Sequence, residues 1–167
     1  MDRKTLSVPA LLWKGFLSAL AILALTGTVW AAGKAAPDFT LKDVTGKDYT
    51  LSQLKGKVVV VNFFTIFCQP CRVEMPDLNQ IYKENKAKGL EMLGICLKAD
   101  PAQLRFLAKQ MALDYPFLVG TDAVDQAYGS VAVVPTTFII DRQGNIVQTI
   151  EGARKKEDFL KVIKPLL

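Results

Sequence analysis

Residues 58–71 read VVVVNFFTIFCQPC, a run of β-branched and aromatic residues that leads into two cysteines separated by two residues. The nearly continuous apolar run over residues 57–64 is typical of a strand buried on both faces in the centre of a sheet. Cys68 and Cys71 lie within one helical turn of each other, so a helix that begins between them would bring the two sulfurs within bonding range. The cysteine pair is therefore predicted to lie where a central strand passes into a helix.

A helix is predicted over residues 69–88, directly after the first cysteine. Pro70 suits its first turn, where no backbone donor is needed, and Gly89 can end it. Pro76 lies farther inside and is expected to kink the helix. The unpaired amides and the dipole at the start of a helix stabilise an anion, so a cysteine placed there loses its proton more readily than a free cysteine.

This placement predicts thiol–disulfide exchange, a reaction in which a thiolate is the nucleophile. We expect Cys68 to be the exposed thiolate that attacks a substrate disulfide, and Cys71 to be the buried thiol that releases the product. The redox-active disulfide Cys68–Cys71 then takes the place of a cofactor, and no metal site is predicted. The alternatives are a structural disulfide and a zinc site, but zinc needs four ligands, and the chain offers one more cysteine and no histidine.

The third cysteine, Cys96, falls within a predicted strand. Unpaired cysteines are usually buried, so we interpret Cys96 as an inert strand residue. The alternative is a thiol that pairs with another chain.

Strands and helices alternate along the rest of the chain. A turn signal at residues 44–47 predicts a β-hairpin, and residues 33–37 are expected to be a linker. The predicted strands are 57–64, 90–97, 117–119, 136–141 and 145–151, and the predicted helices are 69–88, 124–128, 155–167 and one that begins at residue 101. This order predicts an α/β fold with a mixed central sheet flanked by helices on both faces and an N-terminal β-hairpin extension, in one domain over residues 33–167.

The composition of the chain limits its classes of function. Half of the 167 residues are hydrophobic and 22% are charged, so the chain can bury a core. The absence of histidine excludes catalytic triads and metal sites that are built on imidazole. The net charge is +5, and the basic residues are interspersed with acidic ones, so no nucleic-acid partner is expected.

Residues 1–32 have the pattern of an export signal. Three basic residues precede an uncharged run over residues 15–32. Small residues at the end of this run suit cleavage of a signal peptide, but the run is also about long enough to span a bilayer as an uncleaved membrane anchor. Both alternatives place the domain in the periplasm or on another extracytoplasmic face, where disulfides persist, with membrane contact only through this segment if it stays uncleaved.

Three segments resemble one family of thiol-disulfide oxidoreductases. Residues 60–76, VVNFFTIFCQPCRVEMP, resemble the active-site segment of membrane-associated thioredoxin-like proteins of the TlpA/ResA type, which are periplasmic or cell-surface reductases linked to cytochrome c maturation. Residues 133–141, VVPTTFIID, resemble the cis-proline strand of that family, and residues 36–41 resemble its opening. The resemblance implies a thioredoxin-like fold with a redoxin domain.

The resemblance also implies roles for residues around the cysteines. Pro135 would be cis and pack beside Cys68, and a substrate chain would lie against Val134 as an added strand. Glu74 matches a carboxylate that influences the thiols, and the alternative is an acid in the first helical turn that suits the dipole. Asn62 occupies the position of the buried acid that thioredoxin uses for proton transfer, and an amide cannot titrate. The residues implied in catalysis are Cys68, Cys71, Pro135 and Glu74, and those implied in substrate binding are Phe67, Gln69, Pro70 and Val134.

The resulting prediction is an extracytoplasmic protein disulfide reductase with a role in cytochrome c maturation. Its partners would be protein thiols and disulfides, together with a membrane thiol that donates electrons. One alternative is a thiol peroxidase, because Thr65 lies three residues before Cys68 as in peroxiredoxins, although Val61 replaces their preceding proline. The other is a non-catalytic module of the copper-chaperone type, a family that uses a histidine which this chain lacks.

Overall fold

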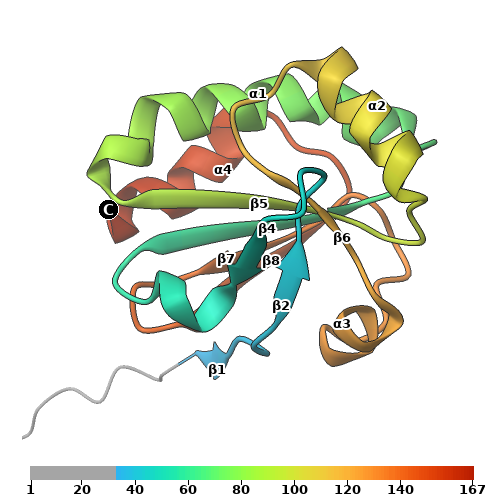
Figure 1. Cartoon of the computed structure of the whole chain (residues 1–167). Helices are drawn as coiled ribbons and strands as arrows, with labels where there is room; N and C mark the ends of the chain where they lie inside the picture. Colours follow the sequence, from blue (N-terminus) through green and yellow to red (C-terminus); the bar gives the residue numbers. More distant parts are fainter. Residues whose placement is uncertain (1–32) are drawn as a thin grey trace, which may run out of the picture. The chain divides into compact units, whose positions relative to one another are not determined.

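The apolar run that ends before the first cysteine forms β4 (Val58–Phe64), the central strand of a six-stranded sheet (Figure 1). The computed structural model describes residues 33–167. β5 pairs with β4 in parallel on one side and β7 pairs antiparallel on the other. Every residue of β4 is buried, because its side chains alternate between two core clusters, one on each face of the sheet. The strand order is β1-β8-β7-β4-β5-β6, with β1 at Lys34–Ala35, β8 at Asn145–Glu151, β7 at Thr136–Ile140, β5 at Leu90–Cys96 and β6 at Phe117–Val119. The sheet is mixed, as predicted.

Three helices cover one face of this sheet: α1 (Gln69–Asn85), α2 (Pro101–Met111) and α4 (Lys156–Ile163) (Figure 1). α1 joins β4 to β5 and α2 joins β5 to β6, and both connect neighbouring parallel strands. Crossovers of this kind are right-handed, so the two helices lie on the same face. The core between the helices and this face includes Val58, Val60, Phe64, Met75, Leu78, Leu104, Leu107 and Phe159.

Smaller elements cover the opposite face of the sheet. They are the hairpin of β2 (Thr40–Lys42) and β3 (Asp48–Thr50), the 3-10 turn at Leu51–Leu54 and the short helix α3 (Asp122–Ala127). Aromatic rings fill this side of the core: the Phe63 ring centroid lies 5.1 Å from that of Tyr128 and 5.6 Å from that of Phe138. The predicted N-terminal hairpin and the predicted helices on both faces are confirmed.

Two elements differ from the prediction. Residues 34–35, expected in a linker, form the edge strand β1, because they pair with the first residues of β8. The short helix α3 begins at Asp122, earlier than predicted, because the Thr121 hydroxyl caps it by accepting a hydrogen bond from the Val124 amide (3.3 Å). The first difference arises from a partner far away in the sequence, and the second from a local cap.

α4 ends at Ile163, earlier than predicted, and the chain continues as a 3-10 turn at Lys164–Leu166, because Pro165 has no amide proton to extend the hydrogen bonds of the α-helix. The predicted signal peptide or anchor, residues 1–32, lies outside the described residues. Within residues 33–167, no helix is long and apolar enough to cross a membrane.

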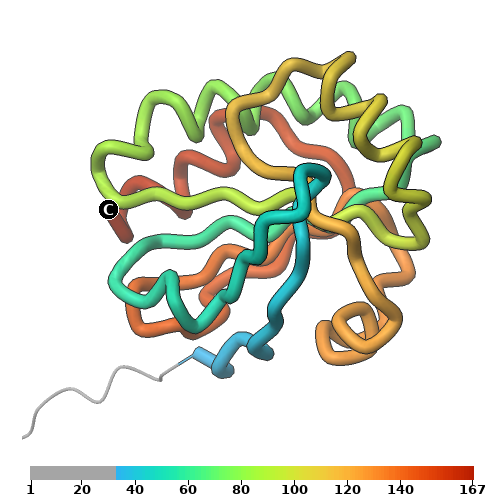
Figure 2. Tube along the Cα trace, viewed as in Figure 1, coloured from blue at the N-terminus to red at the C-terminus, as the bar shows by residue number. Residues whose placement is uncertain are grey.

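Arg142 fixes the end of the sheet that lies farthest from the start of α1. Its guanidinium donates hydrogen bonds to the carbonyl oxygens of Gly56 (2.8 Å), Lys88 (3.3 Å), Leu166 (3.2 Å) and Leu167 (2.6 Å). In Figure 2, the turn between β7 and β8 that carries Arg142 lies beside the loop that leads into β4, at the same end as the C-terminus. One side chain therefore holds three segments that are far apart in the sequence.

Candidate active site

The turn from strand to helix places Cys68 at the N-cap of α1. β4 ends at Phe64, and the Cys68 amide donates a hydrogen bond to the Thr65 carbonyl oxygen (3.2 Å), which closes the turn. The Cys68 backbone is extended, and its Sγ atom accepts a hydrogen bond from the Cys71 amide (3.2 Å). A sulfur in this position faces the unpaired amides and the positive end of the helix dipole, and both favour a thiolate.

Cys68 and Cys71 form a disulfide, with a distance of 5.3 Å between their Cα atoms. Only 9% of the surface of Cys68 and 1% of that of Cys71 is exposed. The expectation of a freely exposed Cys68 is wrong for this disulfide form, because the Val134 carbonyl oxygen lies 3.7 Å from its Sγ atom and covers one side. Cys68 is still more accessible than Cys71, as the predicted exchange reaction requires of the cysteine that attacks the substrate.

The peptide bond between Val134 and Pro135 is cis, as the resemblance implied. This loop leads directly into β7 and places Val134 against Cys68. On its other side, the Pro135 carbonyl oxygen accepts a hydrogen bond from the Gly152 amide (2.7 Å). The loop is therefore held between the disulfide and the segment that follows β8.

Glu74 is buried, with 3% of its surface exposed. Because α1 begins at Gln69, Glu74 lies beyond the first turn, and the alternative of a first-turn acid is wrong. Its carboxylate accepts hydrogen bonds from the Arg154 amide (2.8 Å) and from the Asn62 side-chain amide (3.2 Å). Burial raises the pKa of Glu74 to about 7, and these hydrogen bonds oppose the rise only in part. A carboxyl group that titrates near neutral pH therefore lies one helical turn after Cys71.

Asn62 links Glu74 to the rest of a polar row across the sheet. Its side-chain amide also donates a hydrogen bond to the hydroxyl of Thr137, its pairing partner on β7 (2.8 Å). On β5 the pairing partner of Asn62 is Gly94. Gly94 has no side chain and leaves room for the Tyr115 ring, which would lie 3.2 Å from a Cβ atom at this position. The Tyr115 hydroxyl is buried without a hydrogen-bond partner among residues 33–167, and burial, with a contribution from the Glu74 carboxylate, raises its pKa. This face of the sheet therefore holds a group of polar atoms within an apolar core.

Three members of this polar group were not predicted from the sequence. Arg154 contributes only its backbone amide, which leaves no signal in the type of residue. Thr137 lies two residues after Pro135, and its place beside that motif is a signal that could have identified it. Tyr115 precedes a short strand and had no sequence signal of its own.

Comparison with known proteins identifies the family. Residues 31–163 match the family model described as Redoxin. The chain belongs to the redoxin family. It is 38% identical to the thiol-disulfide oxidoreductase ResA of Geobacillus kaustophilus over 142 residues, which are 83% of this chain and 81% of the relative. It is 34% identical to ResA of Bacillus subtilis over 137 residues, which are 80% and 76% of the two chains.

A solved structure agrees with this assignment. The crystal structure of a thiol:disulfide interchange protein of the thioredoxin family from Chlorobium tepidum matches with a TM-score of 0.76 and 33% identity, over 82% of this chain and 98% of that one. This redoxin is therefore a thiol-disulfide oxidoreductase of thioredoxin-like fold, with Cys68 and Cys71 as its CxxC pair.

The residues implied in substrate binding surround the disulfide of this redoxin. Phe67 is 86% exposed, and Gln69 and Pro70 are exposed in the first turn of α1. Val134 is half-buried on the other side of Cys68. The structure thus brings all four residues to the surface around the nucleophile, and their contact with a substrate stays a prediction.

Cys96 differs from the other two cysteines of the redoxin. It is the last residue of β5 and is fully buried. Burial raises the pKa of its thiol to about 12, so it remains protonated at neutral pH. The predicted position of Cys96 in a buried strand is confirmed, and its lack of reactivity stays a prediction.

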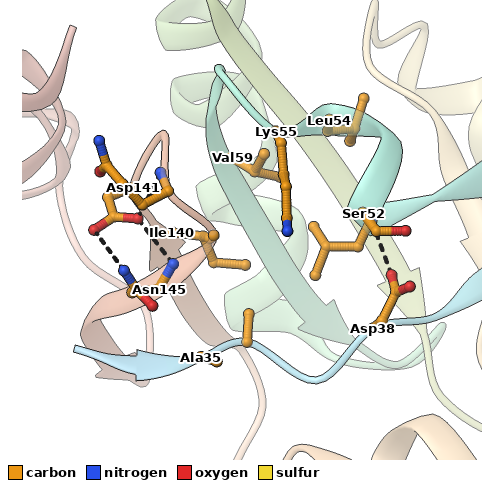
Figure 3. Close-up of a pocket in the computed structure, with 13 residues that line it drawn as sticks. Ala35, Asp38, Ser52, Leu54, Lys55, Val59, Ile140, Asp141 and Asn145 are labelled. Carbon is orange, nitrogen blue, oxygen red and sulfur yellow. Dashed lines mark hydrogen bonds between the residues drawn. The ribbon is translucent and has the colours of Figure 1, made fainter. Parts of the chain in front are cut away.

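Figure 3 shows a cavity of about 290 Å³ that is lined by residues of the 3-10 turn at Leu51–Leu54 and of the turn between β7 and β8. These turns lie at the opposite end of the sheet from the disulfide. Lys55 points between two carboxylates there, Asp38 and Asp141. Asp38 accepts a hydrogen bond from the Ser52 amide and Asp141 accepts one from the Asn145 amide, each at 2.8 Å. Because these carboxylates already stabilise local turns and no cysteine lines the cavity, it is not the redox site.

Proposed function

We propose that this redoxin is an extracytoplasmic protein disulfide reductase. The position of Cys68 at the N-cap of α1, next to the loop of Val134 and Pro135, is the observation that supports this proposal most strongly. The helix end supplies an acidified nucleophile, and the loop offers backbone along which a substrate chain could lie as an added strand. Phe67, Gln69 and Pro70 would contact the same chain.

In the reducing direction, the Cys68 thiolate attacks one sulfur of a substrate disulfide. A mixed disulfide forms between Cys68 and the substrate, and the second substrate sulfur leaves as a thiolate. The Cys71 thiolate then attacks Cys68, the Cys68–Cys71 disulfide forms, and the first substrate sulfur leaves. Two electrons pass from the enzyme dithiol to the substrate, and a dithiol donor must return them for the next cycle.

We propose that Glu74 accepts the proton of the Cys71 thiol. The two residues are three positions apart on α1, so both side chains emerge on the same buried side of the helix. With a pKa of about 7, the carboxylate can accept the proton of the Cys71 thiol and release it again at neutral pH. Asn62, which cannot titrate, would orient the carboxylate through its hydrogen bond.

The cellular setting follows from the sequence pattern and the family. Residues 1–32 would act as a signal peptide or membrane anchor and residues 33–167 as the exported thioredoxin-like domain, in the periplasm or an equivalent compartment. Disulfides form readily there, so a membrane thiol protein would have to supply the electrons. The resemblance to reductases of cytochrome c maturation favours the haem-attachment cysteines of apocytochromes as substrates.

Trapping with the variant Cys71→Ala tests the substrate class. Without the resolving thiol, Cys68 should remain in mixed disulfides with exported proteins, and a thiol reductant should release them for identification. The double variant Cys68→Ala, Cys71→Ala is the matched control and should trap nothing. If Cys71→Ala formed no adducts when expressed with its leader, the proposed reaction with protein disulfides would be wrong.

The reduction potential of the Cys68–Cys71 pair tests the direction of electron flow. A reductase should equilibrate with thiol buffers near the potential of thioredoxin, about −270 mV. A value near that of the oxidase DsbA, about −120 mV, would instead mean that the enzyme introduces disulfides.

A further inference from the structure

An apolar groove lies directly beside the redox site, between the turn that carries Cys68 and helix α2. It has a volume of about 500 Å³. The two phenylalanines Phe67 and Phe106 line it, together with Arg72 of α1 and the polar side chains Gln103 and Gln110 of α2. We call this feature the Phe67–Phe106 groove. It begins at the residue that precedes the nucleophile.

Neither phenylalanine belongs to the hydrophobic core of residues 33–167. α2 packs against the sheet through Leu104 and Leu107, which are buried, whereas Phe106 is 70% exposed and Phe67 is 86% exposed. Large aromatic side chains that lie together at the surface of a soluble domain mark an interaction site more often than scattered apolar residues do.

The charge of the groove favours one kind of occupant. The Arg72 guanidinium donates two hydrogen bonds to the Ile66 carbonyl oxygen, at 3.2 and 3.0 Å, which hold it in the groove. No carboxylate of residues 33–167 forms a salt bridge with Arg72, and no acidic residue lines the groove. The groove therefore combines an apolar surface with an unneutralised positive charge, and a carboxylate on a partner would complement it.

We propose that the Phe67–Phe106 groove binds the segment of a substrate protein that flanks its target cysteine, with a large apolar side chain between the two rings and an acidic residue next to Arg72. Val134 lies against Cys68, and the residue before Cys68, Phe67, lines the groove, so a chain that lies on the Val134 loop and reaches Cys68 comes next to the groove. This inference rests on the proposed function and adds a sequence preference to it.

Exchange with short synthetic peptides tests the preference. The probes are capped ten-residue peptides with one central cysteine, activated as a mixed disulfide with 5-thio-2-nitrobenzoate, whose release is followed by absorbance. One peptide carries phenylalanine three residues to either side of the cysteine, and its matched peptide carries alanine there. Each is made with glutamate or lysine next to those positions. The reduced wild-type enzyme should react with the phenylalanine peptides about tenfold faster, measured as the second-order rate constant for release of thionitrobenzoate, the size expected for burying one aromatic side chain.

The variant Phe106→Ala should reduce this preference to about twofold, and Arg72→Gln should remove the preference for glutamate over lysine. Val147→Ala, which shortens another exposed apolar side chain on β8, is the matched control and should keep both preferences. Phe106 is exposed on a helix, so its replacement by alanine should leave the circular dichroism spectrum of the folded protein intact.

The outcomes separate the inference from the function on which it rests. If the wild type reacts with all peptides at one rate, or if Phe106→Ala keeps the preference, the groove does not bind substrate although the enzyme still exchanges disulfides. If the wild type reacts with none of them, the proposed function itself is wrong. If sedimentation shows a dimer that Phe106→Ala dissociates, the groove is a contact between two copies of the chain and the inference is overturned.

Discussion

The two faces of the central sheet are both buried, but they bury different chemistry. The face under α1, α2 and α4 holds Glu74 and Asn62, together with the Tyr115 hydroxyl, which has no hydrogen-bond partner within residues 33–167, and the core cluster on this face includes both cysteines of the disulfide. The face under the hairpin and α3 holds a cluster of aromatic rings around Phe63, and its tyrosine, Tyr128, donates a hydrogen bond to a backbone carbonyl.

This contrast suggests that the two faces have separate roles. The aromatic face has the properties of a stabilising core: close ring contacts and a satisfied hydroxyl. The helical face contains polar groups that cost stability when they are buried, and it contains them next to the cysteines. We therefore expect changes on the aromatic face to alter stability, and changes on the helical face to alter the chemistry.

The largest effect on stability is expected from Phe63→Ala. Phe63 is fully buried among Tyr128 and Phe138, so the variant should lower the free energy of unfolding by about 3–5 kcal/mol through the cavity that it leaves. Urea denaturation of residues 33–167 measures this loss. The matched variant Phe67→Ala, at an exposed position, should lower the free energy of unfolding by less than about 0.5 kcal/mol. An equal loss at both positions would show that burial of Phe63 in the aromatic cluster does not stabilise the fold.

A smaller effect should appear as a pH dependence that belongs to Glu74. Its folded pKa, about 7, lies above the ordinary value of 4.5, so the folded state binds this proton more tightly than the unfolded state. Stability from this group is therefore fully present below pH 4.5 and is lost as pH rises to about 7, by an amount of about 3 kcal/mol. The difference in unfolding free energy between the wild type and Glu74→Gln should fall across this window, and a flat difference would show that Glu74 titrates normally.

On the aromatic face, Tyr128→Phe should have a modest cost. The Tyr128 hydroxyl donates a hydrogen bond to the Pro37 carbonyl oxygen (3.0 Å), and its loss should lower the free energy of unfolding by about 1 kcal/mol. Thermal denaturation followed by circular dichroism can detect this change. The rate of disulfide exchange should stay the same, and a slower rate would mean that the two faces are coupled.

The smallest effect, and one of opposite sign, is expected from Tyr115→Phe. Among residues 33–167 its buried hydroxyl has no hydrogen-bond partner, so removing it should leave the free energy of unfolding unchanged or raise it by up to about 1 kcal/mol. The same denaturation experiment provides the comparison. A loss as large as that of Tyr128→Phe would show that the Tyr115 hydroxyl has a partner after all.

The junction between β4 and α1 could be predicted from the sequence because several local signals agree there. The apolar run indicates a buried strand, Pro70 suits the first helical turn, and Cys68 lies between them. The cis state of Pro135 was available only through the resemblance, since most bonds before proline are trans.

The surroundings of Glu74 could not be predicted, because its partners lie far away in the sequence. Arg154 is 80 residues from Glu74 and contributes only a backbone amide. The Phe67–Phe106 groove was missed for a different reason. The helical spacing of Leu104 and Leu107 is typical of the buried side of a helix, but periodicity does not show whether the neighbouring Phe106 faces open solvent or a groove.

The contacts of Arg142 have a consequence for folding kinetics. Its guanidinium can reach the carbonyl oxygens of Gly56, Lys88 and Leu167 only after the β7–β8 turn has met the loop before β4, the turn that follows α1 and the C-terminal turn. These hydrogen bonds should therefore form after the rate-limiting barrier has been crossed. We expect Arg142→Ala to accelerate unfolding in stopped-flow experiments while the refolding rate hardly changes, so that this arginine sets how long the native state lasts rather than how fast it is reached.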